Sequence, residues 1–266
     1  MKKVRIIYRI LPALLVLLFI SVSFRTFGAQ PVKQQYYEIK IYRIAPAQET
    51  RVDNYLKDAY LPALHRAGIP KVGVFKPVEK DTAYGKLIYV FIPVNSVDQY
   101  LELAGKLEKD QVFTQAGKDF IDAPYNDPPY KRYESILLKA FAFMPQFKAP
   151  NYTNPASERI YELRSYESPT EAKAAKKIHM FNQGGEMALF EKLGFNAVFY
   201  GEVLMGSHKP NLMYMTTFKD MVTHDEKWQA FRNSPGWKQL SGLEEYKNTV
   251  SKPNPYLLHP ASYSDF

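Results

Sequence analysis

Residues 161–166 read Tyr-Glu-Leu-Arg-Ser-Tyr, and residues 37–42 read Tyr-Glu-Ile-Lys-Ile-Tyr. The two stretches are 124 positions apart (161 minus 37), and three more pairs of similar segments follow in the same order, with shifts of 120 to 126 positions. These pairs are residues 64–69 and 190–195, residues 87–90 and 212–215, and residues 137–139 and 257–259. Ordered similarity at one spacing indicates two copies of one structural unit.

Each copy has the pattern of a β-α-β-β-α-β unit. Alternating apolar and polar residues predict strands, and apolar residues three or four apart predict helices. In the first copy, strands are expected at residues 36–43, 72–77, 87–93 and 135–143, and helices at 48–67 and 97–120. In the second copy, strands are expected at residues 159–166, 197–203, 211–218 and 256–263, and helices at 170–193 and from 224 onward. Four strands with two helices on one face make a ferredoxin-like unit. The sequence therefore predicts an α+β fold, with two tandem ferredoxin-like units packed sheet to sheet as an α/β barrel.

The N-terminus has the three-part layout of a secretory signal peptide. Residues 1–9 are basic, residues 10–24 are almost wholly apolar, and the small residues Gly28 and Ala29 follow. Cleavage near Ala29 predicts an exported protein, periplasmic or extracellular, with no membrane attachment afterwards; an uncleaved anchor is the alternative. The predicted domains are a signal peptide (1–29), a first repeat (30–145), a linker (146–157) and a second repeat (158–266).

The formal charge of +8 overstates how basic the mature chain is. Residues 1–29 hold five basic residues and no acidic one, so the remainder carries 8 − 5 = +3. So small a charge gives no support to nucleic-acid binding, which needs a concentrated basic patch. The chain has no cysteine, and its five histidines show no metal-site spacing, so neither a disulfide nor a zinc site is predicted. No nucleophile motif, phosphate loop or dinucleotide fingerprint occurs, so no cofactor is implied by a motif.

The first strand of each copy is the most informative part of the chain for function. Side chains alternate across a strand, so an apolar set shares one face and an acid–base–tyrosine set shares the other. The apolar set is expected to meet the helices, and the acid–base–tyrosine set is expected to face the space between the sheets. The acid–base–tyrosine set comprises Glu38, Lys40 and Tyr42 in the first copy and Glu162, Arg164 and Tyr166 in the second.

Two interpretations of this set stay open. Its carboxylates and bases can form a buried ion-pair network, because buried charges need partners and these supply each other. Alternatively, they line a polar cavity for an anionic or hydrogen-bonding small molecule. In that case Arg164 is a forked donor and the two tyrosines are further donors.

His179 is a weaker candidate within the expected helix 170–193. A histidine at such a position can ligate haem iron, or it can be a half-buried polar residue bonded to a neighbour. The cluster Trp228, Phe231 and Trp237 lies near the last helix of the second copy. We expect these three residues to be core residues, with a cavity wall as the alternative.

The chain resembles the NIPSNAP family, within the dimeric α/β-barrel superfamily. The resemblance rests on residues 161–166, 193–195, 228–232, 235–237 and 257–260. The first copy is similar but diverged, with Ile39-Lys40 where the motif has Leu-Arg. The resemblance implies a ferredoxin-like fold paired into a barrel and leaves the reaction open. The wider superfamily contains cofactor-free oxygenases, haem-dependent chlorite dismutases and haem-degrading enzymes.

Three functions are therefore expected as alternatives. The first is an exported small-molecule-binding protein with a polar cavity between the two sheets. The second is an interaction or scaffold protein whose barrel is filled by bulky side chains. The third is an oxygenase or a haem-handling enzyme, with His179 as the haem ligand. Two units in one chain can close a barrel internally, so a homo-oligomer is allowed but not required.

Overall fold

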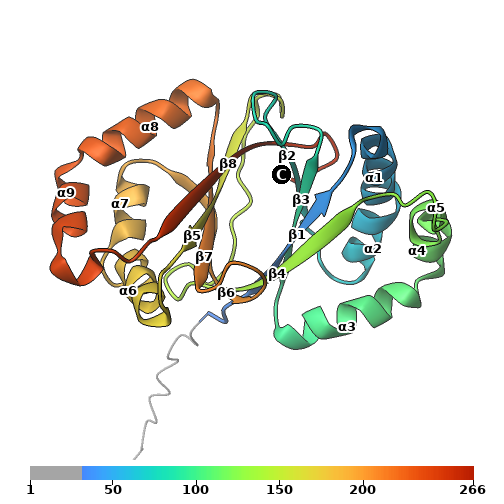
Figure 1. The fold of residues 1–266 in the computed structure, drawn as a ribbon, viewed down its shortest axis with the longest axis horizontal. Helices are drawn as coiled ribbons and strands as arrows, with labels where there is room; N and C mark the ends of the chain where they lie inside the picture. Colours follow the sequence, from blue (N-terminus) through green and yellow to red (C-terminus); the bar gives the residue numbers. More distant parts are fainter. Residues whose placement is uncertain (1–31) are drawn as a thin grey trace, which may run out of the picture. The chain divides into compact units, whose positions relative to one another are not determined.

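The computed structural model describes residues 32–266, which form one compact unit (Figure 1). The signal peptide predicted at residues 1–29 lies outside the described residues. The first half contains β1 (Tyr36–Arg43), α1 (Glu49–Tyr55), α2 (Leu61–Arg66), β2 (Gly73–Pro77), β3 (Leu87–Val94), α3 (Val97–Glu108), α4 (Gln111–Ala116), α5 (Lys118–Ile121) and β4 (Arg132–Ala140). The second half contains β5 (Ile160–Glu167), α6 (Glu171–Phe181), α7 (Glu186–Lys192), β6 (Asn196–Met205), β7 (Asn211–Phe218), α8 (Met221–Asn233), α9 (Pro235–Gly242) and β8 (Lys252–Pro260).

The strands form one closed barrel in the order β1-β3-β2-β8-β5-β7-β6-β4. The first half contributes β4-β1-β3-β2 and the second contributes β8-β5-β7-β6, so both halves have the same internal order. The halves join where β2 pairs with β8 and where β4 pairs with β6, and every pairing is antiparallel. The predicted α+β barrel fold is confirmed. Closure gives each strand two neighbours, so none of the eight is left as an open edge.

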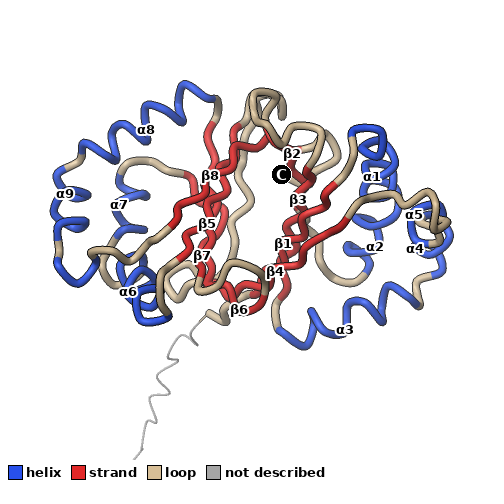
Figure 2. Tube along the Cα trace, in the orientation of Figure 1, coloured by secondary structure: helices blue, strands red, loops and turns tan. Residues whose placement is uncertain are grey.

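The helices lie outside the barrel, in two groups (Figures 1 and 2). Helices α1–α5 cover the strands of the first half, and α6–α9 cover those of the second. A buried apolar layer separates each helix group from its strands. None of the helices in residues 32–266 is long and apolar enough to cross a membrane.

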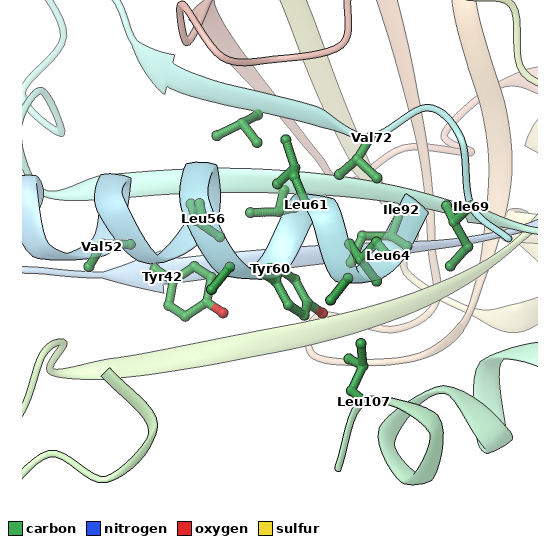
Figure 3. Close-up of a cluster of buried hydrophobic side chains, with 14 of the residues drawn as sticks. Tyr42, Val52, Leu56, Tyr60, Leu61, Leu64, Ile69, Val72, Ile92 and Leu107 are labelled. Atoms are coloured by element: carbon green, nitrogen blue, oxygen red, sulfur yellow. The ribbon is translucent and has the colours of Figure 1, made fainter. Parts of the chain in front are cut away.

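The helix nearest β1 shows how sequence spacing creates one of these layers. Val52, Leu56, Tyr60 and Leu64 are four residues apart and buried, so they share the face that meets the strands (Figure 3). A π-helical turn at Leu56–Tyr60 joins α1 to α2, and Pro62 lies in the first turn of α2. A proline is tolerated there because the first residues of a helix have no intrahelical partner for their N–H groups.

The barrel interior is apolar and filled. Aromatic rings pack there across the halves, such as Phe91 against Phe199 at 4.9 Å between ring centroids and Phe75 against Tyr161 at 4.8 Å. Phe266 packs on Phe75 from the chain terminus. The interior cluster includes both apolar sets of the first strands: Tyr37, Ile39 and Ile41, and Tyr161 and Leu163.

The prediction of which strand face lies inside was therefore wrong. The alternation was read correctly, but the apolar set faces the barrel interior and the acid–base–tyrosine set faces the helices. No polar cavity lies between the sheets at these positions, because the interior is packed with apolar side chains. An interior enclosed by eight strands favours apolar side chains. The hydroxyls of Tyr37 and Tyr161 are buried there without a hydrogen-bond partner among the described residues. The helix-facing side can hold charges because the helices supply their partners.

Candidate functional site

Strand β5 carries the candidate site on its helix-facing side. Arg164 Nε donates a hydrogen bond to Glu162 Oε1 at 2.8 Å, and Arg164 Nη1 donates to Tyr166 Oη at 3.0 Å. Arg164 Nη2 lies 2.7 Å from the same carboxylate oxygen. The guanidinium is therefore fixed between its two neighbours on one face of the strand, and the strand sets its direction.

The carboxylate of Glu162 holds the Arg164 guanidinium in place. It is 2% exposed, and Trp228 Nε1 from α8 donates to its Oε2 at 2.5 Å. His224 Nε2 lies 3.4 Å from the same oxygen. Burial acts to raise the pKa of Glu162, but its contacts with His224 and Arg164 outweigh burial and lower that pKa. The carboxylate therefore stays ionised and holds the cation in place.

Arg164 also contacts two aromatic residues, Trp228 and Tyr166. Arg164 Cζ lies 3.8 Å from the centroid of the Trp228 ring, a close cation–π contact. Tyr166 Oη is 2.9 Å from Tyr214 Oη, which comes from the neighbouring strand β7. Each partner of Arg164 thus has a hydrogen bond of its own, and this makes the site rigid.

A cavity of about 340 Å³ opens beside Arg164, between the strands and helices of the second half. Its volume is at the small end of the range of roughly 300 to 1,000 Å³ that is typical of small-molecule sites. A second hollow of about 330 Å³ lies between α7 and β6, but its only charged side chains are Lys148 and Glu191. The first cavity has four charged side chains, so we take it as the candidate site. It is lined by Arg164, Tyr166, Lys177, Glu186, Phe190, Trp228, Phe231, Arg232, Trp237, Val250 and Pro253.

Two further charged residues of the lining form a buried ion pair. Lys177 from α6 and Glu186 from α7 are 4% and 2% exposed, and Lys177 Nζ donates to Glu186 Oε2 at 2.7 Å. The rings of Phe181 and Trp237 lie 4.7 and 5.6 Å from the ammonium group. Burial raises the pKa of Glu186, and Lys177 only partly opposes this. The pair can therefore hold or exchange a proton beside the cavity.

The matching set of the first half is arranged differently. Lys40 Nζ donates to Tyr60 Oη at 3.1 Å and lies 3.8 Å from Glu38 Oε1, which accepts a hydrogen bond from Ser135 Oγ at 2.5 Å. Tyr42 is 3% exposed and packs among the rings of the first helix group. Glu38 and Lys40 thus have partners within the first half. The ion pairs are separate, one in each half, rather than the one buried network that the structural interpretation expected. The predicted candidates thus lie in two separate places rather than around one shared cavity.

His179 lies outside the candidate site. It is exposed on α6, where its Nδ1 is 2.8 Å from Tyr246 Oη, and it is absent from the cavity lining. Helical rotation separates it from Lys177, which faces the cavity. His179 therefore does not line this cavity, and its assignment to the ligand-binding set stays a prediction. Among the described residues, no group of three or more histidine or acidic side chains is placed to hold a metal ion.

Sequence reasoning missed Lys177, Glu186 and Arg232. Nothing in the local pattern separated them from surface charges, because the first two are brought together only by the break between α6 and α7. Gly185 allows that break with a φ of 89°. Trp228, Phe231 and Trp237 were expected in the core, with a cavity wall as the alternative. The expectation of core residues is confirmed for Trp228 and Phe231, which are buried in the apolar cluster, and all three residues also line the cavity, with Trp237 half-buried.

Comparison with known proteins agrees with this fold. Residues 161–265 match the NIPSNAP family model, so the second half carries the NIPSNAP domain that the sequence resemblance implied. No curated protein sequence matches the chain.

Solved structures resemble most of the chain. A protein named "putative monooxygenase" from Lactobacillus acidophilus NCFM is 13% identical, with a TM-score of 0.54 over 86% of this chain and 94% of that one. A second protein of that name, from Fusobacterium nucleatum, is 11% identical, with a TM-score of 0.52 over 86% and 93%. An anthrone oxidase-like protein is 11% identical, with a TM-score of 0.51 over 87% and 93%. At such low identity, the likeness concerns the fold.

Proposed function

We propose that the cavity of the second half binds a small anionic molecule and that Arg164 is its main anchor. The observation that carries the proposal is a rigidly held guanidinium at the wall of a cavity of about 340 Å³. This cavity differs from the one expected between the two sheets, because it lies between strands and helices of the second half and only Arg164 and Tyr166 of the acid–base–tyrosine set line it.

Arg164 has donors to spare for a ligand. A guanidinium carries five N–H groups, and at most three of them are directed at Glu162 and Tyr166. At least two N–H groups are therefore free of these partners. Two parallel N–H donors suit a carboxylate or a phosphate. Because Glu162 and Trp228 already fix the guanidinium, little conformational entropy is lost when a ligand binds.

The charges at the cavity also favour an anion. Arg164, Lys177 and Arg232 contribute three positive charges, and Glu186 contributes one negative charge from the lining. Glu162, directly behind Arg164, adds a second negative charge. The sum is 3 − 2 = +1, which a singly charged anion would balance.

The filled interior also fits the alternative of a non-catalytic interaction protein. It does not count against ligand binding, because the cavity lies outside the barrel. A third candidate is an oxygenase acting in the same cavity, since the fold likeness extends to proteins named for monooxygenase activity. The buried Lys177–Glu186 pair could exchange a proton with a substrate in such a reaction. Oxygen uptake with a bound aromatic acid would favour this candidate, and a bound acid recovered unchanged would exclude it for that acid.

Export through residues 1–29 is part of the proposal. It rests on the basic, apolar and small-residue segments of that stretch. The mass of the protein recovered from the periplasm or the medium would test it. A chain beginning near Gln30 is expected, and a full-length chain retained in the membrane fraction would contradict cleavage.

Tryptophan fluorescence offers a direct test of binding. The chain has two tryptophans, and both line the cavity, so a ligand there should change the emission. Benzoate, hexanoate and inorganic phosphate would be titrated against the wild-type protein, Arg164→Gln and Arg43→Gln. Arg43 is an exposed arginine of β1 that pairs with Glu134, far from the cavity lining, and serves as the control.

Arg164→Gln should weaken binding of the best anion by roughly 10- to 150-fold, the value of a hydrogen bond to a charged group. Arg43→Gln should bind like the wild type. Equal affinity in Arg164→Gln and the wild type would refute the proposal.

A further inference from the structure

We infer that the anion bound in this cavity is carried on a flat aromatic ring system and that Trp237 is the residue that selects for the ring. The inference rests on the proposed function, because it identifies the ligand of the same cavity. It depends on the shape and chemistry of the walls rather than on the cation.

Aromatic side chains form much of the wall. Five of the lining residues are aromatic, and they come from a strand and three different helices. Trp237 and Phe231 pack with ring centroids 4.6 Å apart and planes tilted by 35°. Trp228 stands at 82° to Phe231, with centroids 5.5 Å apart. The aromatic rings thus stand at different angles around the cavity, and a flat aromatic guest can pack against them in a stacked or an edge-to-face arrangement.

The planar guanidinium cation of Arg164 also forms part of the cavity wall. Trp228 covers one face of the Arg164 guanidinium at 3.8 Å. A guanidinium is planar and stacks on aromatic rings through either face, and Arg164 also borders the cavity. The free N–H donors lie in the guanidinium plane, so the anionic group of an aromatic guest can take them while its ring lies against the aromatic wall.

Trp237 differs from the other rings in its freedom to contact a ligand. Trp228 and Phe231 are 5% and 3% exposed and are held by packing in the core. Trp237 is half-buried, and it lies in the first turn of α9, where Ser234 caps the helix. Its indole N–H has no hydrogen-bond acceptor among the described residues. The Trp237 ring therefore has exposed surface and an N–H group that a ligand can contact, so it is placed to select a ligand.

Size and charge narrow the ligand class further. A volume of about 340 Å³ is at the small end of the range for small-molecule sites, which suits one or two fused rings with a small substituent. The net charge of +1 at the site favours a single anionic group. The ligand class is therefore a mono- or bicyclic aromatic acid with one negative charge.

The test compares two acids that differ in aromaticity and little in size. Binding of 2-naphthoate and of decahydro-2-naphthoate would be measured by calorimetry in the wild type, Trp237→Leu and Arg164→Gln. Leucine keeps the wall apolar while removing the ring. In the wild type, 2-naphthoate should bind roughly two- to twelvefold tighter, which is the value of one aromatic pair beyond the area it buries. In Trp237→Leu this preference should disappear, with decahydro-2-naphthoate affected little.

The outcomes separate the two proposals. Equal binding of the two acids by the wild type would overturn the aromatic inference and leave the anion site standing, provided that Arg164→Gln weakens both. A preference that persists in Trp237→Leu would overturn the role of Trp237. If neither acid binds, the inference is overturned. If Arg164→Gln also leaves the binding of every tested anion unchanged, the proposed function is overturned as well. The comparison in the wild type needs no variant, so it decides the ligand class even if Trp237→Leu fails to fold.

Discussion

Replacing Glu162 by glutamine should destabilise the protein by about 3 kcal/mol. Glu162 is 2% exposed and receives hydrogen bonds from Arg164 and Trp228. Glutamine has nearly the same shape, but it has one acceptor oxygen and turns an N–H₂ donor toward groups that are themselves donors. Arg164 then loses its counter-charge. Breaking a buried ion pair costs about 3 to 5 kcal/mol. The side chain of Arg164 is 19% exposed and keeps some hydration, so the low end applies.

Urea unfolding would measure this loss, with the emission of the two tryptophans as the signal. The midpoint should fall while the slope m stays unchanged, because the surface exposed on unfolding is the same. A loss of about 3 kcal/mol also lowers the melting temperature of a domain of this size by roughly 6 to 12 °C.

Glu38→Gln provides the matched control in the first half. Glu38 occupies the same strand position, but its cation Lys40 is 3.8 Å away, and its main hydrogen bond comes from Ser135. We expect a loss of about 1 kcal/mol, the value of one ordinary hydrogen bond. The reasoning would be refuted if Glu162→Gln cost less than about 1 kcal/mol, or if both variants lost the same amount.

Two other predictions concern buried polar groups. Lys177→Met leaves Glu186 buried without its cation, so the free energy of unfolding should fall by about 3 to 5 kcal/mol near pH 8. Burial already raises the pKa of Glu186. This loss should therefore shrink as the pH falls, because protonation removes the buried charge. Equal losses at pH 8 and pH 5 would contradict it. Tyr37→Phe should be neutral or stabilising by at most ~1 kcal/mol, because the Tyr37 hydroxyl is buried without a hydrogen-bond partner among the described residues. Tyr214→Phe serves as the comparison, because it removes the hydrogen bond to Tyr166 and should lower the free energy of unfolding by about 1 kcal/mol in the same denaturation assay. A larger loss in Tyr37→Phe than in Tyr214→Phe would show that the interior hydroxyl has a role.

Much of the fold could be predicted from local patterns. The strand at residues 36–43 lies where alternation placed it, because a strand with one apolar face has a distinct period of two. The strands at residues 87–93 and 211–218 lie at short, mainly apolar runs, as strands buried on both faces do. Gly68 and Gly194 end their helices with φ values of 87° and 74°, as glycines after an apolar helical run commonly do.

Helix continuity was predicted less well. The helix expected at residues 170–193, with Gly184-Gly185 as its weak point, is divided there into α6 and α7. Residues 97–120 contain α3, α4 and α5, but α3 runs through Gly105, where the sequence suggested a break. Asp110 caps α4 through its side chain, and Gly185 opens the chain before α7. Apolar periodicity persists across such breaks because both pieces still pack on the same strands. Periodicity therefore does not reveal the breaks.

The site was predicted in part. Arg164 and Tyr166 line the cavity and Glu162 supports them, whereas Glu38, Lys40 and Tyr42 lie in a separate packed cluster and His179 is exposed. Repetition in the sequence suggested equal roles for the two sets. The helices that cover them differ, however, and only those of the second half supply Trp228, Lys177 and Glu186.

The sequence by itself determined the order of the strands and helices and the division of β1 and β5 into an apolar and a charged face. Both properties are local, since they follow from backbone periodicity and side-chain polarity. The tertiary structure decided which face lies inside, because both faces of these strands are covered, one by the opposite wall of the barrel and one by helices. It also decided that Lys177 and Glu186 meet Arg164 at one cavity. Contacts between segments distant in the chain depend on closure of the barrel and on helix packing, and no period in the sequence encodes them.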